Sequence, residues 1–254
     1  MNVIKKIVKL FLVKIRCILL AFPKRIQCNI CLWEGRRFIS NQWHKNINCP
    51  KCNSGIRHRL FIAALQNIKE VSIEKIIHNK DILHFAAEKI ISKFISDKCN
   101  NYKTADILRK GFDLRLDMSN MEVQDASYDI VMAFDVLEHV PDYKKALEEV
   151  YRVLKPGGFG IFTVPQKDNL LETYEDPNII TSKEREEHFG QWDHLRIFGD
   201  DISKIIENKG FHVNIVDESK FPNNIQENNV LFPPVLSNLP GVTNYRKVFF
   251  CKKI

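Results

Sequence analysis

The 254-residue chain lacks an uninterrupted apolar stretch long enough to cross a bilayer. Spanning the hydrocarbon core takes about 20 mostly apolar residues, and lysines and arginines interrupt the Ile-, Leu- and Val-rich residues 3–22. A secretory signal is not expected either, because the apolar run 17–22 is short and no small-residue cleavage site follows it. The sequence therefore argues against a membrane-spanning or exported protein.

Acidic residues are almost missing from the first 60 residues, where 13 lysines and arginines stand against the single acid Glu34, a net charge of +12. The other 194 residues hold 25 lysines and arginines and 30 acids, a net charge of −5. Charge distribution informs about partners rather than about fold. The N-terminal part is therefore expected to face an anionic partner or to stay solvated.

Apolar residues near the N-terminus recur at helical spacing and predict an amphipathic helix over residues 1–25. At about 100° per residue they fall within one arc of about 120°, and most cations lie outside it. Such a helix can lie in a membrane interface, which would make residues 1–24 a peripheral membrane contact. The alternative is a helix docked on its own domain. The apolar set is Ile4, Ile7, Val8, Phe11, Ile15, Ile18, Leu19 and Phe22.

Two Cys-x-x-Cys pairs, separated by 17 residues, predict a metal site. Two such pairs supply the four thiolates of a closed tetrahedral zinc site, which favours a structural zinc ribbon over residues 26–56. The competing interpretation is a redox pair. His44 and His58 are spare ligands only if a cysteine is missing. The predicted zinc ligands are Cys28, Cys31, Cys49 and Cys52.

The other cysteines, Cys17, Cys99 and Cys251, are isolated and are expected to be packed or free thiols. Zinc thiolates and unpaired cysteines together favour a reducing compartment. We therefore expect a cytoplasmic protein, with possible contact at the inner membrane face through the N-terminal helix. Residues 57–79 are expected to form a connecting helix, whose basic start at residues 57–59 is either an anion site facing the main domain or solvated charge.

Residues 128–165 predict a strand, a helix and a second strand. Residues 130–134 form a short apolar run suited to a buried strand. Pro141 can open the helix, and Pro156-Gly157-Gly158 can stop it before a strand at residues 159–164. This is a parallel β–α–β unit, and ligands in such sheets bind at the carboxyl ends of the strands.

Further strands are expected at residues 81–87, 102–106, 114–117, 211–216 and 245–251, with a helix at residues 88–98. Alternating strands and helices predict a doubly wound, mostly parallel, seven-stranded sheet over residues 80–254. Residues 221–242 are rich in Asn and Pro and are expected to be a long loop.

Residues 128–165 resemble the class I S-adenosylmethionine-dependent methyltransferases (type 11-like), whose fourth strand, helix and fifth strand often read close to FDxVxxxxVLEHVPD…xxALxExxRVLKPGGxxxxxxP. The resemblance implies a Rossmann-like methyltransferase fold with S-adenosyl-L-methionine as cofactor. The first strand of that family usually ends VLDxGxGxG. In this chain His84 occupies the position of the aspartate in that motif, and Ala86, Glu88 and Ile90 replace the three glycines.

The chain also resembles a bacterial subgroup of this family that is often found near surface-glycan genes. That subgroup has a cysteine-rich front, an LHFAPE-like strand end and a later segment similar to residues 173–196. The resemblance implies that Phe85, Ala86 and Glu88 line the cofactor. An alanine at 86 lets the backbone approach the ligand if its φ stays negative.

Carboxylates at strand ends are the other candidate cofactor ligands. Asp106 can accept both ribose hydroxyls, or it is a turn residue or helix cap. Asp117 can accept from the adenine amino group, with the Met118 N–H reaching the ring, or it is a loop residue. Asp135 lies where the transferred methyl is expected, and His139 beside it is either a packed histidine or a base.

Residues 166–198 form a polar and aromatic insert, in which Asp193-His194 is the best general-base candidate because a carboxylate can orient a neutral imidazole. Three functions remain open. The first is methyl transfer to a small-molecule or glycan-linked acceptor, where positioning does most of the work. The second is methylation of ribosomal RNA, since the basic front suits phosphate contacts. The third is a non-catalytic binding module on the same fold.

Overall fold

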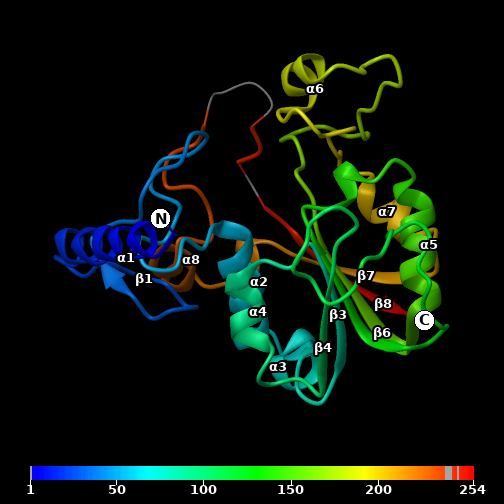
Figure 1. The fold of residues 1–254 in the computed structure, drawn as a ribbon, viewed down its shortest axis with the longest axis horizontal. Helices are drawn as coiled ribbons and strands as arrows, with labels where there is room; N and C mark the ends of the chain where they lie inside the picture. Colours follow the sequence, from blue (N-terminus) through cyan, green and yellow to red (C-terminus); the bar gives the residue numbers. More distant parts are fainter. Residues whose placement is uncertain (1, 238–241, 245) are drawn as a thin grey trace.

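The computed structural model describes residues 2–237, 242–244 and 246–254, with one six-stranded sheet at its centre (Figure 1). The strands are β3 (Asp81–Phe85), β4 (Asn101–Ala105), β5 (Tyr128–Phe134), β6 (Leu154–Thr163), β7 (Phe211–Val216) and β8 (Val248–Lys253). They lie in the order β4-β3-β5-β6-β8-β7, in which β8 is antiparallel to both neighbours and the other pairs are parallel. The expected doubly wound, mostly parallel sheet is confirmed.

The expected strand over residues 114–117 is wrong, and so is the total of seven strands. Among the described residues this segment forms only isolated bridges: a parallel one from Leu114 to Ala105, beside the edge strand β4, and an antiparallel one from Asp117 to Asn120. Arg115 and Asp117 are exposed, so the segment offers little apolar surface to extend the pairing. The strand expected from Tyr245 begins at Val248; Tyr245 itself lies outside the described residues.

Helices cover both faces of the sheet (Figure 1). One face carries α5 (Tyr143–Val153) and α7 (Ile202–Glu207), and the other carries α2 (Ile56–Asn67), α3 (Ile73–Ile76) and α4 (Lys89–Ile95). Each face of the sheet has its own apolar core. Strand β5 contributes side chains to both cores, with Val131 in one and Met132 in the other. This explains why residues 130–134 are apolar without alternation. Short 3₁₀ segments are η1 (Lys69–Val71), η2 (Leu137–His139) and η3 (Glu218–Lys220).

The helix of the β5–α5–β6 crossover starts later than expected. Asp142, not Pro141, precedes it, and the Asp142 carboxylate accepts a hydrogen bond from the Lys145 N–H, as N-cap side chains do. The helix ends at Val153 because the chain enters β6 directly. The segment 156–158 is therefore an irregularity inside β6 rather than a helix stop, and Gly157 has a φ of +75° there.

The cysteine-bearing segment holds a two-stranded antiparallel pair, β1 (Ile26–Gln27) and β2 (Glu34–Gly35). Close to it lies α8 (Asn223–Asn229), a helix inside the stretch that was expected to be only a loop. The Asn229 side chain donates to the Gln27 carbonyl at 3.2 Å. The long connection between β7 and β8 is therefore partly ordered by packing against the cysteine-bearing segment.

Arg59, from the first turn of α2, is fully buried at this junction. Its guanidinium donates to the carbonyls of Ser54 (2.5 Å), Asn229 (2.8 Å) and Val230 (2.9 Å) and stacks over the Phe38 ring. Burial lowers the pKa of Arg59 to about 10, so it remains charged at neutral pH. The expectation that residues 57–59 are either an anion site or solvated charge is wrong for Arg59, which instead joins three segments of the chain.

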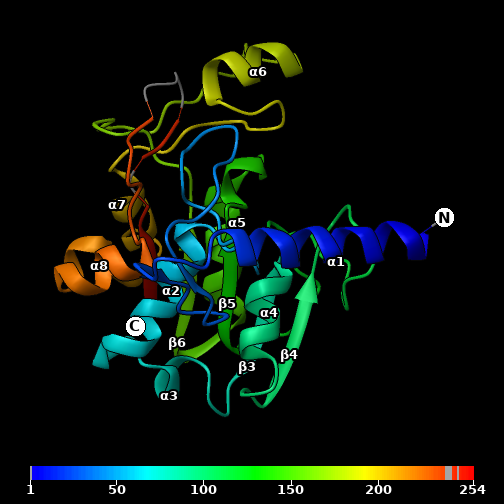
Figure 2. The ribbon, with the colours of Figure 1, turned by 90° about the vertical axis from the view of Figure 1, so that its left-hand side faces the viewer.

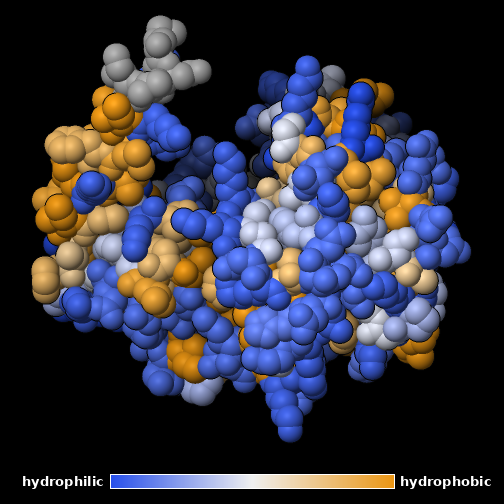
Figure 3. All heavy atoms as spheres, turned by 60° about the horizontal axis from the view of Figure 1, so that its bottom comes forward, coloured by the Kyte–Doolittle hydropathy of each residue, from blue (hydrophilic) through white to orange (hydrophobic). Residues whose placement is uncertain are grey.

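The N-terminal helix α1 (Asn2–Leu19) extends away from the rest of the molecule (Figure 2). Apolar side chains gather along it on the surface (Figure 3), and Phe11 and Ile18 are 62% and 72% exposed. The apolar face of α1 is therefore not docked on the protein's own domain, as one alternative had it. The side chain of Ile4 lies outside the described residues. No helix among the described residues is long and apolar enough to span a membrane.

The insert between β6 and β7 carries α6 (Ser182–Phe189), which lies at the top of the view in Figure 1. Thr181 and Glu184 form a reciprocal capping box at its start, and Gly190 ends it with a left-handed φ of +82°. The charged residues of this part of the insert therefore lie in a helix that is capped at both ends.

Candidate functional site

Four sulfur atoms of the cysteine-bearing segment converge. The Sγ atoms of Cys28, Cys31, Cys49 and Cys52 all lie within 4.8 Å of one another, with 3.6 Å between Cys28 and Cys52 and between Cys31 and Cys49. Four thiolates around one zinc at about 2.3 Å would lie about 3.8 Å apart. The donor set and its spacing therefore fit a tetrahedral metal site.

The spare histidines are not part of this cluster. His58 accepts a hydrogen bond from the Gly55 N–H through Nδ1 and donates from Nε2 to the Glu88 carboxylate at 3.1 Å. His44 is buried elsewhere in the segment, and its pKa is lowered by burial and by the nearby Arg246. Both were expected to be non-ligating, and their positions agree with that expectation.

The carboxyl ends of β3 and β5 carry a network of charged side chains. Arg57, at the start of α2, pairs with Glu88 just after β3 at 2.7 Å and with Asp135 just after β5 at 3.2 Å. Arg246 approaches Asp135 at 3.5 Å. Arg57 is partly exposed, and in this arrangement it is already paired with two carboxylates that the sequence analysis assigned to the cofactor.

These pairs change the acidity of the carboxylates. Burial alone would raise the pKa of Glu88, but the His58 hydrogen bond and the Arg57 charge outweigh burial and lower it to about 2. Burial acts against ionisation of Asp135 as well, and Arg57 and Arg246 lower its pKa to about 2. Both groups are ionised at neutral pH. One oxygen of Glu88, Oε2, is buried and has no hydrogen-bond partner among the described residues.

His84, at the position of the family's acidic residue, is fully buried beneath this network. Tyr102 donates its hydroxyl hydrogen to Ser92 at 2.8 Å, so the 2.7 Å contact with His84 requires an Nδ1–H donor. The His84 Nε2 atom then carries the lone pair and has no hydrogen-bond partner among the described residues. Burial lowers the pKa of His84 to about 4, which keeps the ring neutral at physiological pH.

The backbone is left-handed at both strand ends. Ala86 has a φ of +49° and Asp135 a φ of +51°, in a region that glycine adopts easily and other residues rarely. The negative φ on which the backbone approach at Ala86 was made conditional is therefore not found. Such strained residues cluster at functional sites.

Asp106 follows β4 and is nearly buried. Its Oδ1 accepts the N–H groups of Leu108 and Arg109, and its Oδ2 accepts from the Arg109 Nε at 2.6 Å. The structure thus places this carboxylate in its own turn, which is the alternative that the sequence left open. Asp117 is exposed and accepts from Ser119, while the neighbouring Met118 packs in the core.

The candidate base pair is arranged differently from the expectation. The Asp193 carboxylate lies 3.4 Å from the His139 Nδ1, not on the ring of His194. The His194 Nδ1 instead faces the Phe189 carbonyl at 3.1 Å, and its Nε2 points to Glu138 at 4.0 Å. The Gln191 side-chain amide explains this arrangement. It donates a hydrogen bond to the Asp193 carboxylate and holds that carboxylate away from the His194 ring.

Glu138 is the group that the sequence analysis missed. It is fully buried, and neither carboxylate oxygen has a hydrogen-bond partner among the described residues. Burial, and then the charge of Asp135, raises its pKa well above the usual range. Its place in the Leu137-Glu138-His139 run, next to a candidate histidine, was the available signal.

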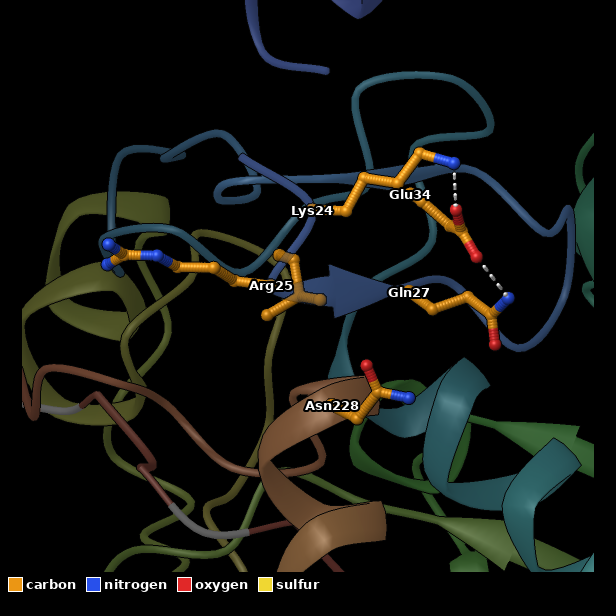
Figure 4. Close-up of a pocket in the computed structure, with 6 residues that line it drawn as sticks. Lys24, Arg25, Gln27, Glu34 and Asn228 are labelled. Atoms are coloured by element: carbon orange, nitrogen blue, oxygen red, sulfur yellow. Dashed lines mark hydrogen bonds and ion pairs between the residues drawn. The ribbon is translucent and has the colours of Figure 1, made fainter. Parts of the chain in front are cut away.

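A separate hollow of about 190 Å³ lies on the cysteine-bearing segment (Figure 4). Lys24 pairs with Glu34 at 2.6 Å across it, and Gln27 donates to the same carboxylate at 3.2 Å. The Glu34 carboxylate already accepts from these two side chains, so this hollow offers a ligand fewer unpaired polar groups than the strand ends do.

Comparison with known proteins agrees with this architecture. Residues 92–162 match a family model described as a methyltransferase domain. A sterol 24-C-methyltransferase of Eremothecium gossypii is 31% identical over 109 residues, which are 42% of this chain and 28% of that protein. A sterol 4-C-methyltransferase of Caenorhabditis elegans is 23% identical over 185 residues, 65% of this chain and 52% of that protein. The chain thus spans roughly a quarter to a half of these relatives.

The fold is that of the class I S-adenosylmethionine-dependent methyltransferases. The methyltransferase from Mesorhizobium loti aligns with a TM-score of 0.52 and 12% identity over 78% of this chain and 100% of that one. Within this fold, the methyltransferase-domain match covers the segment from α4 to β6, which includes Asp106, Asp135 and Glu138.

Proposed function

We propose that this protein transfers a methyl group from S-adenosyl-L-methionine to a small-molecule or glycan-linked acceptor. The observation that carries the proposal is the gathering of Glu88 and Asp135 at adjacent strand ends, with Asp106 at the next one, inside a fold shared with methyltransferases. Ligands bind at this edge of a parallel sheet.

The residues present suit the parts of this cofactor. The orphaned Glu88 Oε2 offers a buried negative acceptor for an ammonium group. Asp106 offers a carboxylate for ribose hydroxyls if Arg109, whose side chain is 58% exposed, turns away. Asp117, together with the Met118 N–H, is assigned to the adenine. When bound, the cofactor supplies an electrophilic methyl group; the chain supplies position and exclusion of water.

The acceptor is assigned to the side of β5 and the insert. His139, whose Nδ1 lies 3.4 Å from the Asp193 carboxylate, and His194, whose ring centre lies 4.9 Å from that of His139, line this side of the site. The pKa of His194 is lowered by burial and by His139, which favours its neutral form. The resemblance to a subgroup near surface-glycan genes favours a sugar-linked acceptor, while the curated relatives named above methylate sterols.

Incubation with methyl-labelled S-adenosyl-L-methionine separates the alternatives. We expect label in hydroxyl-bearing sugar or lipid-linked sugar acceptors. Label only in RNA, with binding that weakens steeply with salt, would favour the RNA alternative. Cofactor binding without label in any acceptor class would favour the binding module.

We also propose that the four cysteines hold one structural zinc ion. All four ligands come from the chain and no position is left for a substrate, so the ion would stabilise the segment rather than act in catalysis. Arg59, in α2, donates to the Ser54 carbonyl near Cys52 and to the Asn229 carbonyl at the end of α8. An ordered metal site would therefore also stabilise the packing of α2 and α8 against this segment.

We further propose that α1 binds anionic membrane surfaces peripherally. Its apolar face is exposed from Ile7 to Leu19, and Lys5, Lys6, Lys9 and Lys14 accompany it. Buried apolar area and electrostatic attraction to anionic lipid act together in such helices. A protein held there could reach a lipid-linked acceptor.

A further inference from the structure

Three side chains from two distant parts of the chain converge beyond the end of β5. A carboxylate oxygen of Glu138 and one ring nitrogen each of His139 and His194 all lie within 4.8 Å of one another. Glu138 and His139 belong to η2, and His194 comes from the insert. The Leu195 N–H donates to the Glu138 carbonyl at 2.9 Å, so main-chain bonding fixes the two segments together.

A second tie makes the arrangement rigid. The Arg196 guanidinium is nearly buried and donates to the carbonyls of Leu137 (3.0 Å), Val140 (2.6 Å) and Pro141 (3.0 Å). The same guanidinium pairs with Glu175 at 2.8 Å. Because these hydrogen bonds fix η2 and the insert to each other, the side chains of the cluster are preorganised.

The Glu138 side chain is the independent sign that something is bound here. It has no exposed surface, and both of its oxygens lack a hydrogen-bond partner among the described residues. A buried carboxyl group without partners is costly, and such groups normally pair or coordinate metals. The His194 Nε2 lies 4.0 Å from one Glu138 carboxylate oxygen.

Both imidazoles are oriented as metal ligands are. The His139 Nδ1 contacts the Asp193 carbonyl at 3.2 Å, and the His194 Nδ1 contacts the Phe189 carbonyl at 3.1 Å. A carbonyl only accepts, so each Nδ1 carries the hydrogen and each Nε2 keeps its lone pair. An Nδ1–H bonded to a carbonyl or carboxylate is the usual outer support of a metal-bound histidine.

We propose that Glu138, His139 and His194 form a second metal site, which binds one first-row divalent transition cation. Two imidazole nitrogens and one carboxylate oxygen suit such cations and leave coordination positions open. The site differs in chemistry from the four thiolates. Resting on the proposed function, the open positions next to Asp135 would select acceptors that present an oxygen donor.

Cobalt(II) is a suitable probe for full-length protein that carries one zinc ion per chain. A zinc ion held by all four thiolates leaves no open position there, so cobalt should not enter the cysteine cluster. We expect calorimetry to show one equivalent of cobalt bound without cofactor, and the visible spectrum to lack thiolate-to-cobalt absorption. Because no turnover is measured, failure here is distinct from failure of the proposed methyl transfer.

Glu138→Gln is the decisive variant, because the amide keeps the shape of the side chain and removes the carboxylate ligand. We expect cobalt affinity to fall at least tenfold with an unchanged or higher melting temperature. His194→Asn should give a similar loss, and Glu148→Gln, on the exposed face of α5, should bind cobalt as the wild type does. No cobalt bound by folded wild type, or equal affinity in Glu138→Gln, would overturn the proposal.

Discussion

At the scale of single residues, His84 is a buried titratable group with a definite consequence for acid stability. Its ring is neutral in the folded protein because burial lowers its pKa to about 4, whereas a histidine in the unfolded chain titrates near pH 6.5. Between these two values the unfolded state binds a proton that the folded state does not. Stability therefore falls as the pH drops from about 6.5 to about 4, by up to about 3 kcal/mol.

The variant His84→Gln tests this contribution, because glutamine cannot take up the proton. We expect the variant to be less stable than the wild type near pH 7, and the difference between the two to shrink as the pH falls to about 4. Denaturant midpoints measured at half-unit steps give this difference directly. A constant difference across the range would contradict the neutral buried histidine.

At the scale of elements, the turn after β3 is strained by its side chain. The left-handed conformation costs a non-glycine residue about 1–2 kcal/mol, while glycine costs about 0.4–1 kcal/mol through a freer unfolded chain. Ala86→Gly, at a φ of +49°, should therefore stabilise the protein by up to about 1 kcal/mol.

The neighbouring Ala87 supplies the matched control, because it is not among the residues with positive φ. Ala87→Gly should lower stability by a few tenths of a kcal/mol to about 1 kcal/mol. Chemical denaturation of both variants decides the matter. If the two glycines acted alike, the strain at position 86 would not be real.

Also at the element scale, α1 should bring the protein to anionic vesicles and leave it free of neutral ones. Phe11→Ser removes an exposed ring from the apolar face, so we expect it to weaken sedimentation with anionic vesicles several-fold, and added salt to weaken wild-type binding as well.

Leu171→Ser is the control, since Leu171 is an even more exposed apolar residue in the insert, far from α1 in sequence. It should sediment like the wild type. Equal sedimentation with neutral and anionic vesicles, or an equal loss in both variants, would remove the proposed membrane role.

At the scale of the whole molecule, the strands and the crossover helix could be predicted because their apolar periodicity is local. β7 matches residues 211–216, and β5 contains the apolar run at 130–134. The strand expected over residues 114–117 could not be excluded from the sequence, because pairing at the edge of a sheet depends on the apolar surface that the neighbouring strand offers. The helix α8 was hidden for a similar reason: its order comes from contacts with the cysteine-bearing segment.

The candidate site divides in the same way. The carboxylates after β3, β4 and β5 were found because strand ends can be located from the sequence. The roles of Arg57 and Glu138 were missed because they arise from contacts across the fold: Arg57 reaches Asp135 from a helix 78 positions earlier in the chain. Only the folded arrangement distinguishes a paired carboxylate such as Glu88 from an orphaned one such as Glu138.

The cysteine-bearing segment should depend on its metal as a unit. Cys49→Ser removes one of four converging thiolates, so we expect loss of stoichiometric zinc and a melting temperature at least about 4 °C lower, equivalent to about 1–2 kcal/mol. Cys99→Ser, outside the cluster, should change neither zinc content nor melting temperature. Purified wild type without zinc, with four reactive thiols at these positions, would refute the assignment.

The most direct test of the whole account is calorimetric titration of the wild type, Asp106→Asn and Asp106→Ala with S-adenosylhomocysteine. We predict one site per chain in the wild type. Asp106→Ala should weaken binding about ten- to a hundredfold, since a lost charge-assisted hydrogen bond is worth about 1.5–3 kcal/mol. It also removes the bonds that hold the turn after β4, whereas asparagine can keep the acceptor that bonds the Leu108 and Arg109 N–H groups. Asp106→Asn should therefore weaken binding while keeping the wild-type melting temperature. Folded wild-type protein that gives no heat with millimolar ligand would contradict the methyltransferase account.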